Sequence, residues 1–472
     1  MKSIYTFVSL FFLVLNAFSQ PSSIPQERWQ KAELFLSQQK DASGFFMLAK
    51  DGRIMMEKGL GYADREQKIP FDHNTLFSIG SITKSFTATA ILLLMEKGLV
   101  DVQDPITKYL DEIPDDKKSI TIHQLLTHSA GFPGAIGDDY EIISTTDFQK
   151  RAWATPLLFA PGQGYNYSNV GYSLLGMIVE KVSGESYSAF LQKNIFKPAF
   201  MSTAGYTNDK ADYSRLAHGY FQDGGDWGTA KDKSWDGNEP SWNLKGNGGV
   251  LMTAMDLYHW YLALRNNMIL KPATLKLQTT PHVKEGEDDS YYGYGFVVSP
   301  DGEVVQHNGG NRVFKADFRW YPKSDMVLVS VSNDANTRLF RLNDQIIDIL
   351  TTGNIPETIH WTIVPIDKFP DGPQQETAKK FIELLQQYSD AEREKFIGQF
   401  FTPGIMERNT KEHINTLFQM LSQDIGKGPV QKVETSPDVL QITMPAGDGG
   451  GRMKIKLNFI GEKIDRIGAE ME

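Results

Sequence analysis

The stretch "FSIGSITKSFTATAILLLMEK", residues 77–97, decides the fold around it. Its mostly apolar run from Ser81 to Lys97, stopped by Gly98, predicts a buried helix. Ser81 stands at the start of that helix, and Lys84 follows three residues later on the same face. The stretch therefore predicts either an ordinary buried helix or a helix that begins with a serine nucleophile and its lysine base.

A serine three residues before a lysine is by itself weak evidence for catalysis. About two such pairs are expected by chance at average composition in a chain of 472 residues, and this chain has two, Ser81–Lys84 and Ser37–Lys40. A helix start offers free backbone N–H groups and a positive dipole to the Ser81 hydroxyl. The same positive helix end, together with burial against the apolar helix, would lower the pKa of Lys84, and a neutral lysine could then accept the serine proton. These properties would allow Ser81 to act as a nucleophile. Other segments of the chain are needed to distinguish Ser81 from Ser37.

Strand-like segments lie on both sides of a mainly helical middle. Asp51-Gly52 joins "GFFMLAK" to "RIMMEKGLGYA" as a two-residue hairpin turn, and a helix over 25–39 precedes them. From about 105 to 265 the apolar spacing is mainly helical, and a helix over 341–352 closes the region. Four strand-like segments stand before that helix: "YGYGFVVS", "EVVQHNG", "VFKADFRWY" and "MVLVSVSN". The economical arrangement is one antiparallel sheet built from both ends, with helices packed on it.

The chain is too long for one compact core, so two domains are expected. We predict a first domain over 20–353 and a proline-punctuated linker over 354–373. Residues 374–472 then predict a small accessory α+β domain with no catalytic cluster. Its expected helices are "ETAKKFIELLQQ" and "HINTLFQML", and its expected strands are "VLQITM", "MKIKLNFI" and "KIDRIGAEM". The predicted fold class of the whole chain is α+β.

The N-terminus has the pattern of a signal peptide over residues 1–19. Lys2 provides the positive charge, an apolar run follows, and Ala17-Phe18-Ser19 is a small-x-small cleavage pattern before Gln20. A membrane anchor is the alternative, but the apolar run is shorter than the ~20 residues that a span needs. We therefore predict export to a periplasmic or extracellular space, with no integral membrane span after cleavage.

Composition excludes several classes of partner and chemistry. The net charge of −10, without a long basic run, argues against nucleic acid and anionic membranes as partners. The absence of cysteine excludes disulfides, thiolate catalysis and cysteine-ligated metals. There is no GxSxG, HExxH or Walker motif, and the nine histidines are scattered. We expect no metal and no cofactor, and a small-molecule or peptide substrate; the oligomeric state is not predicted.

Two further segments combine polar side chains with glycine. "PGQGYNYSNVGYSLLG" places Tyr167 and Asn169 on a turn before an apolar helix, although a packed tyrosine with a helix-capping asparagine is the ordinary alternative. "VVQHNGGNR" places His307, Gly309 and Gly310 directly after a predicted strand. Paired glycines allow backbone to approach a ligand closely.

Taken together, S-x-x-K at Ser81, Y-x-N at Tyr167 and H-x-G at His307 resemble the serine penicillin-binding protein and class C β-lactamase superfamily. The resemblance is closer to its D-alanyl-D-alanine carboxypeptidase and esterase branches, and it covers residues 25–352. It implies a β-lactamase/transpeptidase-like fold, in which an antiparallel sheet flanked by helices joins an all-helical subdomain. The flanking segments also look like recurring family segments: "LLTHSAGF", "YSNVGYSLLGMIVEKVSG" and "GNGGVLMTAMDLYHW".

The resemblance implies an acyl-enzyme mechanism. Ser81 would be acylated, Lys84 would be its base or proton shuttle, and Tyr167 would pass protons, with its pKa brought toward neutrality by the charge of Lys84. Whether Lys84 or Tyr167 is the acylation base stays open. The oxyanion hole would be the backbone N–H groups of Ser81 and Gly310. The implied substrate-binding residues are Asn169, His307, Gly309 and Gly310.

One departure from the family pattern affects the predicted substrate. Typical β-lactamases have lysine where this chain has His307, which would line the far wall of the cleft and is mostly neutral at pH 7. A β-lactam carboxylate needs a cationic anchor there more than an ester does, and the direction of Arg312 is open. We therefore predict an ester or a D-amino-acid peptide as substrate. A class C-like β-lactamase and a catalytically silent cell-wall-peptide-binding protein are the alternatives.

A loop over 222–249, rich in Gly, Asp and Trp, has two possible roles. It either borders the cleft and contacts substrate through its tryptophans, or forms a surface flap that those tryptophans anchor.

Overall fold

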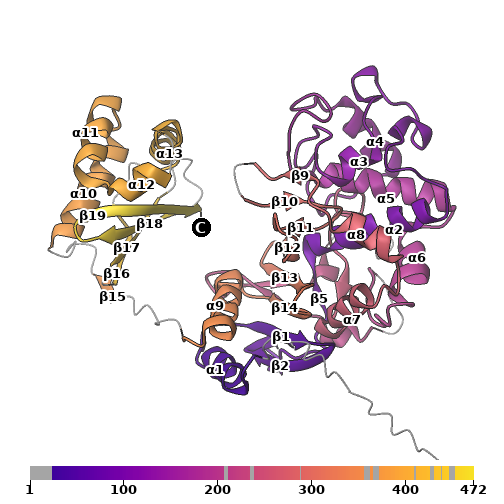
Figure 1. Cartoon of the computed structure of the whole chain (residues 1–472), viewed down its shortest axis with the longest axis horizontal. Helices are drawn as coiled ribbons and strands as arrows, with labels where there is room; N and C mark the ends of the chain where they lie inside the picture. The colour runs from indigo at the N-terminus through magenta and orange to yellow at the C-terminus, as the bar shows by residue number, and fades with distance from the viewer. Residues whose placement is uncertain are drawn as a thin grey trace, which may run out of the picture. The chain divides into compact units, whose positions relative to one another are not determined.

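The computed structural model divides into two compact units, Met1–Pro356 and Glu357–Glu472, each of which we describe by itself (Figure 1). The predicted signal peptide and most of the predicted linker lie outside the described residues. The residues that the structure describes are 24–206, 211–233, 239–286, 289–355, 362–364, 372–408, 411–425, 430–436, 438–445 and 452–471.

An eight-stranded antiparallel sheet, in the order β2-β1-β14-β13-β12-β11-β10-β9, forms the centre of the first unit (Figure 1). β1 pairs with β2 across Asp51-Gly52, whose positive φ angles of 53° and 69° suit a type I′ hairpin. β1 also pairs with β14 from the other end of the unit, which confirms the predicted sheet. The strands are β1 Gly44–Lys50, β2 Arg53–Leu60, β9 Val283–Lys284, β10 Tyr291–Tyr292, β11 Val297–Val298, β12 Val305–Asn311, β13 Phe314–Tyr321 and β14 Met326–Ser332.

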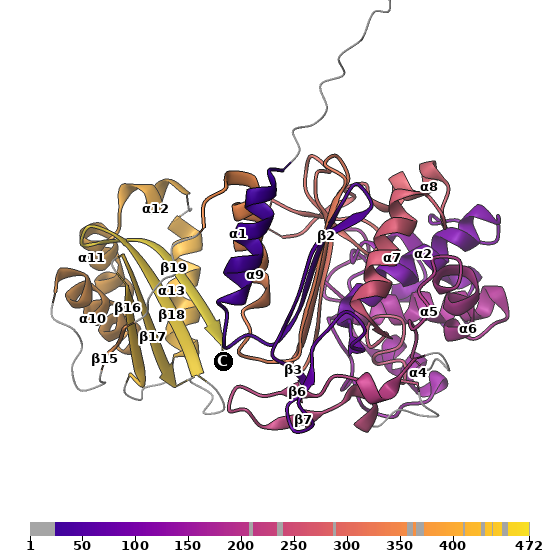
Figure 2. The same ribbon diagram turned by 90° about the horizontal axis from the view of Figure 1, so that it is seen from below.

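Both faces of this sheet are buried. Because side chains alternate along each strand, each strand sends side chains into two separate cores. In β1, Phe45 and Met47 point into the main core, whereas Phe46 and Leu48 point into a second core formed with α1 and α9. Figure 2 shows α1 and α9 on one side of the sheet and α7 on the other. These helices are α1 Gln26–Ser37, α7 Ala254–Arg265 and α9 Leu339–Thr352.

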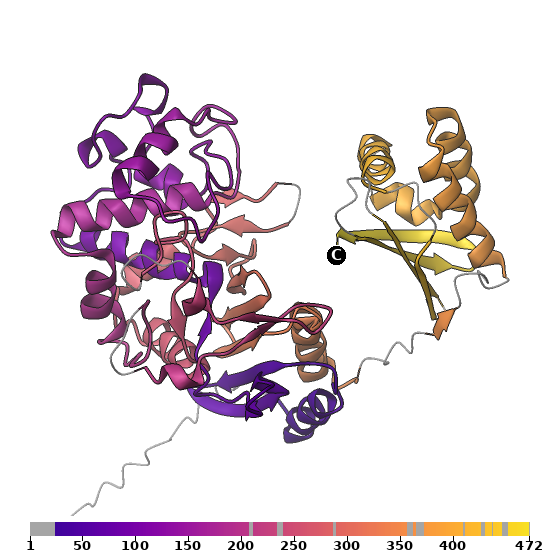
Figure 3. The same ribbon diagram turned by 180° about the vertical axis from the view of Figure 1, so that it is seen from behind.

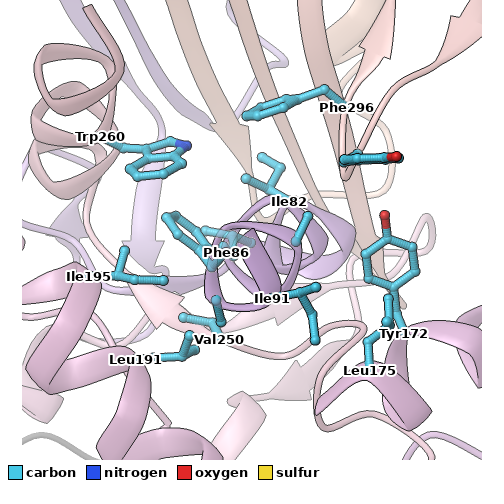
Figure 4. Packing of buried hydrophobic residues seen from close by; sticks show 14 of the residues in the cluster. Ile82, Phe86, Ile91, Tyr172, Leu175, Leu191, Ile195, Val250, Trp260 and Phe296 are labelled. Atoms are coloured by element: carbon cyan, nitrogen blue, oxygen red, sulfur yellow. The ribbon is translucent and has the colours of Figure 1, made fainter. Parts of the chain in front are cut away.

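The helix predicted from Ser81 begins slightly later, because Gly80–Ile82 forms a 3₁₀ turn (η1) before α2, Thr83–Glu96. Gly98 follows the helix end with a φ of 71°, as predicted. α2 packs against α5, Asn169–Ser183, and against α8, Pro272–Gln278. Phe86 of α2 contacts Trp260 at 4.7 Å between ring centroids. Figure 4 shows apolar side chains from several elements around α2. A helix enclosed in this way has no need of a polar face, which explains its apolar sequence.

A predominantly helical subdomain lies beyond α2, as predicted (Figure 1). Its longest helix, α5, is capped by Ser168 at its start and by Gly184 in the left-handed conformation at its end. The helices of this region are α3 Ile122–Leu126, α4 Thr145–Ala154, α5 Asn169–Ser183, α6 Tyr187–Leu191 and α8 Pro272–Gln278.

The segment "YGYGFVVS", predicted as one strand, forms two short strands, β10 and β11. Gly295 between them has a φ of 74°, and a Cβ on it would lie 2.6 Å from the Lys84 carbonyl oxygen. The glycine turn thus lets the sheet edge pack directly on the first turn of α2. The strand is interrupted because of a contact with a segment that is distant in sequence. The alternation of side chains in "YGYGFVVS" does not reveal that contact.

The second unit has a five-stranded antiparallel sheet, in the order β15-β16-β17-β18-β19, covered by helices (Figure 3). In β18 the apolar residues from Met453 to Phe459 alternate inward, as predicted. Two helices, α11 and α12, were not expected, because few of their residues are apolar. The elements are α10 Pro373–Gln386, α11 Asp390–Phe400, α12 Pro403–Arg408, α13 Lys411–Asp424, β15 Thr362–Val364, β16 Lys432–Ser436, β17 Val439–Pro445, β18 Arg452–Ile460 and β19 Lys463–Met471.

The α+β fold class is therefore confirmed. In the part of the chain that the structure describes, no helix has the length and apolar character needed to cross a membrane.

Candidate active site

Ser81 and Lys84 meet at the junction of the 3₁₀ turn η1 and helix α2. The Lys84 Nζ lies 2.9 Å from Ser81 Oγ. The other serine–lysine pair is different: Ser37 is exposed at the end of α1, and its hydroxyl donates to the Glu33 carbonyl of its own helix at 2.8 Å. The structure thus separates two pairs that are equivalent in sequence spacing.

Three oxygen atoms surround the buried Lys84 amine. Besides Ser81 Oγ, the amine donates to Asn169 Oδ1 at 2.8 Å and to the Asn247 carbonyl oxygen at 2.9 Å. An ammonium could donate to all three oxygens. A neutral amine, which has two hydrogens, could donate to the two asparagines and direct its lone pair at the Ser81 hydroxyl. The same geometry therefore serves both protonation states, as a proton acceptor requires.

The electrostatic environment favours the neutral amine. Burial lowers the pKa of Lys84 well below its ordinary value, and the charge of Asp139 acts weakly in the opposite direction. The prediction that the pKa of Lys84 is depressed is thus confirmed. Burial is the main cause, because the side chain lies entirely inside the protein.

Tyr167 lies beside this pair and is held by a buried histidine. The backbone N–H of Ser168 donates to His128 Nδ1 at 3.0 Å, and the His128 ring lies 4.4 Å from the Tyr167 ring between centroids. The Lys84 Nζ lies 4.7 Å from the Tyr167 ring centroid. The Ser81 side chain also acts on Tyr167, as a hydrogen-bonding neighbour that lowers the pKa of the Tyr167 hydroxyl. Ser81, Lys84 and Tyr167 are therefore brought together, as predicted.

The pKa of Tyr167 differs from the expectation. Burial raises it, the hydrogen bond with Ser81 lowers it, and the charge of Glu285 raises it; the net effect is a pKa above the ordinary value. The expectation that the charge of Lys84 brings this pKa toward neutrality is wrong. A lysine with a depressed pKa is mostly uncharged, so it does little to lower the pKa of Tyr167. Burial disfavours the charged phenolate, and this raises the pKa.

Asn169 is the first residue of α5, and its side chain is free to bind Lys84 because its neighbour caps the helix. Ser168 Oγ accepts the backbone N–H of Gly171 at 3.4 Å. The Asn169 N–H donates to the Gly134 carbonyl at 2.8 Å, which fixes the turn. The alternative interpretation of Asn169 as the helix cap is therefore wrong.

Gly309 and Gly310 have different surroundings although they are adjacent in β12. A Cβ on Gly309 would lie 1.9 Å from the Ile79 carbonyl oxygen and 3.1 Å from the Ser81 nitrogen, so only glycine permits this contact. No atom lies within 4 Å of a Cβ built on Gly310. The Gly310 nitrogen would lie 2.6 Å from a Cβ on Gly80. β12 thus lies directly against the turn that carries Ser81, and the two expected oxyanion-hole amides belong to adjacent segments.

His307 lies inside the protein and does not line the cleft wall as expected. It is 2% exposed, its Nδ1 donates to the Asn308 carbonyl at 2.6 Å, and its Nε2 accepts the Tyr292 hydroxyl at 2.9 Å. Burial and the charge of Lys84 lower the pKa of His307 to about 3, against a smaller raising effect of the Asn308 carbonyl. The ring is therefore neutral at physiological pH. The alternation of β12 explains its position, because Val305, His307 and Gly309 share the buried face.

The buried His307 predicts a dependence of stability on pH. Below its ordinary pKa of about 6.5 the unfolded chain binds a proton that the folded chain excludes, so the free energy of unfolding falls as the pH falls. For this group the slope is at most about 1.4 kcal/mol per pH unit between the ordinary value and the folded value. Substituting His307→Gln, which keeps one donor and one acceptor, should flatten the slope between about pH 6 and about pH 4.

Urea unfolding at several pH values checks this expectation. The comparison of the variant with the wild type isolates His307 from other groups that titrate in the same range, including the buried carboxyl of Asp317, whose pKa is raised to about 6 mainly by burial. Equal slopes for the two proteins would show that His307 is not held neutral.

The structure supports the anchoring role of the tryptophan loop, whereas contact of its tryptophans with a substrate stays a prediction. Trp242 is buried, and its indole N–H donates to Thr145 Oγ1 at 2.9 Å, so it anchors the loop. The half-buried Trp227 contacts Tyr140 at 5.8 Å and Phe314 at 5.6 Å between ring centroids, near the end of β12. Trp235 lies outside the described residues.

Two residues at the site were not singled out from the sequence, Asn247 and His128. Asn247 lies in "GNGGV" and His128 lies in "LLTHSAGF". Asn247 contributes only its backbone carbonyl, and His128 packs its ring against Tyr167. Neither role requires a sequence pattern by which the residue could be recognised. Among the residues that the structure describes, no three His, Asp or Glu side chains are arranged to hold a metal ion.

Comparison with known proteins agrees with this geometry. A family model described as Beta-lactamase matches residues 30–351. The chain is 31% identical over 292 residues to penicillin-binding protein 4* of Bacillus subtilis (strain 168), covering 58% of this chain and 64% of that protein. It is 32% identical over 316 residues to the putative penicillin-binding protein PbpX of the same organism, covering 65% of this chain and 75% of that protein.

A penicillin-binding protein from Bacillus halodurans has a similar solved structure. Its TM-score is 0.58 at 29% sequence identity, over 67% of this chain and 99% of that chain. The matched family model covers more than half of this chain, and it includes all three motifs. The chain therefore belongs to the Beta-lactamase family, within the serine penicillin-binding protein and β-lactamase superfamily that its motifs predict.

Proposed function

We propose that this chain is an exported serine hydrolase that forms an acyl-enzyme at Ser81 and hydrolyses an ester or a D-amino-acid peptide. The observation that carries the proposal is the buried Lys84 amine, 2.9 Å from Ser81 Oγ and held by two further oxygens. A buried lysine with a depressed pKa beside a serine is a competent nucleophile–base pair.

Acylation begins when neutral Lys84 accepts the Ser81 proton and Ser81 Oγ attacks the substrate carbonyl carbon. The resulting oxyanion is stabilised by the N–H groups of Ser81 and Gly310. When the tetrahedral intermediate collapses, the bond to the leaving alcohol or amine breaks. The leaving group takes a proton from the Tyr167 hydroxyl, which recovers one from Lys84. Water then attacks the acyl-enzyme by the same route, releasing the acid and restoring the Ser81 hydroxyl.

The two pKa shifts support a division of roles between Lys84 and Tyr167. The pKa of Lys84 is lowered, so its neutral form is accessible, whereas the pKa of Tyr167 is raised, so it keeps its proton. We therefore assign Lys84 as the acylation base and Tyr167 as the proton donor to the leaving group.

The neutral His307 supports an ester or D-peptide substrate over a β-lactam. Its ring is buried and bonded to Tyr292, so it offers no cation for a β-lactam carboxylate. The guanidinium of Arg312 faces a carboxylate, with its Nη2 3.7 Å from Asp138 Oδ2.

Turnover assays combined with peptide mapping of the acylated protein by mass spectrometry test this function. The protein is incubated with a p-nitrophenyl ester, a D-Ala-D-Ala peptide and a chromogenic cephalosporin, then quenched in acid and digested. We expect turnover of the ester or the peptide, with the acyl adduct on the fragment that contains Ser81. Turnover with an adduct elsewhere would contradict the mechanism, and faster turnover of the cephalosporin would favour the β-lactamase alternative. Binding without turnover would favour the silent binding protein.

The domain assignment remains a proposal alongside this function. We assign residues 1–19 to a signal peptide, 20–353 to the hydrolase domain, 354–373 to a linker and 374–472 to an accessory domain without a catalytic role. The hydrolase would then act in a periplasmic or extracellular space.

A further inference from the structure

One surface segment, residues 134–140, connects the two sides of the site. At its start the Gly134 carbonyl accepts the N–H of Asn169, at 2.8 Å. At its end the Tyr140 hydroxyl donates to Asn311 Oδ1 at 2.5 Å, and Asn311 follows Gly310 in β12. The segment thus runs from the Lys84-binding asparagine to the strand that carries the oxyanion-hole glycine.

Three basic side chains in the described part of this region are paired, buried or neutral. Arg312 points to Asp138, at 3.7 Å between Nη2 and Oδ2. The amine of Lys84 is buried among three oxygens, and its pKa is lowered. His307 is neutral because its Nδ1 donates to a carbonyl and its Nε2 accepts a hydroxyl. None of these groups offers a free cation to a substrate carboxylate.

The negative charges are different. The carboxylate of Asp139 is half-buried, and no hydrogen bond or ion pair joins it to another residue in the described part of the chain. Asp139 stands between Asp138, which faces Arg312, and Tyr140, which bonds Asn311, so its backbone lies beside the end of β12. Burial and the charge of Asp138 raise the pKa of Asp139, and the charges of Lys84 and Arg312 act in the opposite direction. Glu285 contributes a second carboxylate, which accepts the neutral hydroxyls of Tyr165 at 2.6 Å and Ser290 at 2.8 Å.

We propose, on the basis of the proposed function, that Asp139 is a specificity-determining residue that selects esters or amides whose acyl group carries a cationic amine and no free carboxylate. A half-buried carboxylate without a partner attracts a cation more strongly than an exposed one does, because the surrounding protein screens it less. The same charge repels an anionic substrate, so one residue supplies both the attraction and the rejection. The nearby Glu285 acts in the same direction.

A matched pair of esters tests this proposal. One is the p-nitrophenyl ester of a trimethylammonio-alkanoic acid, and the other replaces the trimethylammonio group by the isosteric, uncharged tert-butyl group. The measured quantity is the ratio of kcat/KM for the cationic ester to that for the neutral one. We expect Asp139→Asn to lower this ratio about tenfold. Asp139→Glu should restore most of it. Asp115→Asn, which removes an exposed carboxylate paired with Lys118, should leave the ratio unchanged.

The outcomes separate this proposal from the proposed function. If neither ester is hydrolysed in a Ser81-dependent manner, the proposed function fails. If both esters are hydrolysed at Ser81 and Asp139→Asn leaves the ratio unchanged, only the role of Asp139 is overturned. If Asp139→Asn fails to fold, the ratio of kcat/KM for the cationic ester to that for the neutral ester is measured with the wild type at increasing salt concentration. It should fall toward one as the charge is screened, and a constant ratio would overturn the proposal.

Discussion

Replacing Ser81 by alanine is expected to abolish turnover of any ester or peptide that the wild type hydrolyses, with a loss of at least about 10⁴-fold in kcat. The alanine removes the hydroxyl oxygen that lies 2.9 Å from the Lys84 amine and would form the acyl bond. The fold should tolerate the change, since Ser81 lies in a short turn and is not fully buried. The measurement is kcat on the best substrate of the panel, together with labelling by a fluorophosphonate probe.

Ser37→Ala is the matched control for this substitution. Ser37 also precedes a lysine by three residues, but it is exposed and bonded to its own helix. Its substitution should change neither turnover nor labelling. Equal labelling of the wild type and Ser81→Ala would refute the assignment of the nucleophile.

Replacing Lys84 by methionine is expected to lower kcat by about 10³-fold while changing KM little, because a general base acts mainly in the transition state. Methionine has a similar length and no charge, so it should fit the enclosed position. Removing the amine leaves Asn169 Oδ1 and the Asn247 carbonyl without this donor, a cost of about 1–3 kcal/mol in folding stability for each buried group. Thermal unfolding must therefore accompany the kinetic measurement.

Lys40→Met is the control, because Lys40 is the exposed lysine of the other pair. It should leave kcat unchanged. If Lys84→Met kept more than about a tenth of the wild-type kcat, a different group, with Tyr167 the first candidate, would be the base.

Much of the site could be predicted because its residues are close in sequence to recognisable features. Ser81 and Lys84 are one helical turn apart, and the apolar run after them requires a buried helix. Tyr167 and Asn169 precede another apolar helix, and Gly309 follows a strand. The main sheet was also predictable, since alternation in β1 and β14 depends on residues within each strand.

The expectations that proved wrong concern properties that depend on distant contacts. His307 was expected at the cleft wall, but the register of β12 turns its ring inward toward Tyr292. The pKa of Tyr167 was expected to fall, but burial raises it. The "YGYGFVVS" strand is broken where Gly295 contacts Lys84, a residue more than two hundred positions earlier.

By itself the sequence determined which residues are candidates for an acyl-enzyme mechanism, because a serine, a lysine one turn later and glycines that permit close backbone contact are properties of residue type and spacing. Only the tertiary structure decided the burial and the neighbours of the groups to which we assign proton transfer and substrate selection. The depressed pKa of Lys84, the neutral His307 and the unpaired Asp139 arise from burial and from neighbours brought together by folding. Desolvation and Coulomb interactions depend on distance in space, and spacing along the chain does not contain that distance.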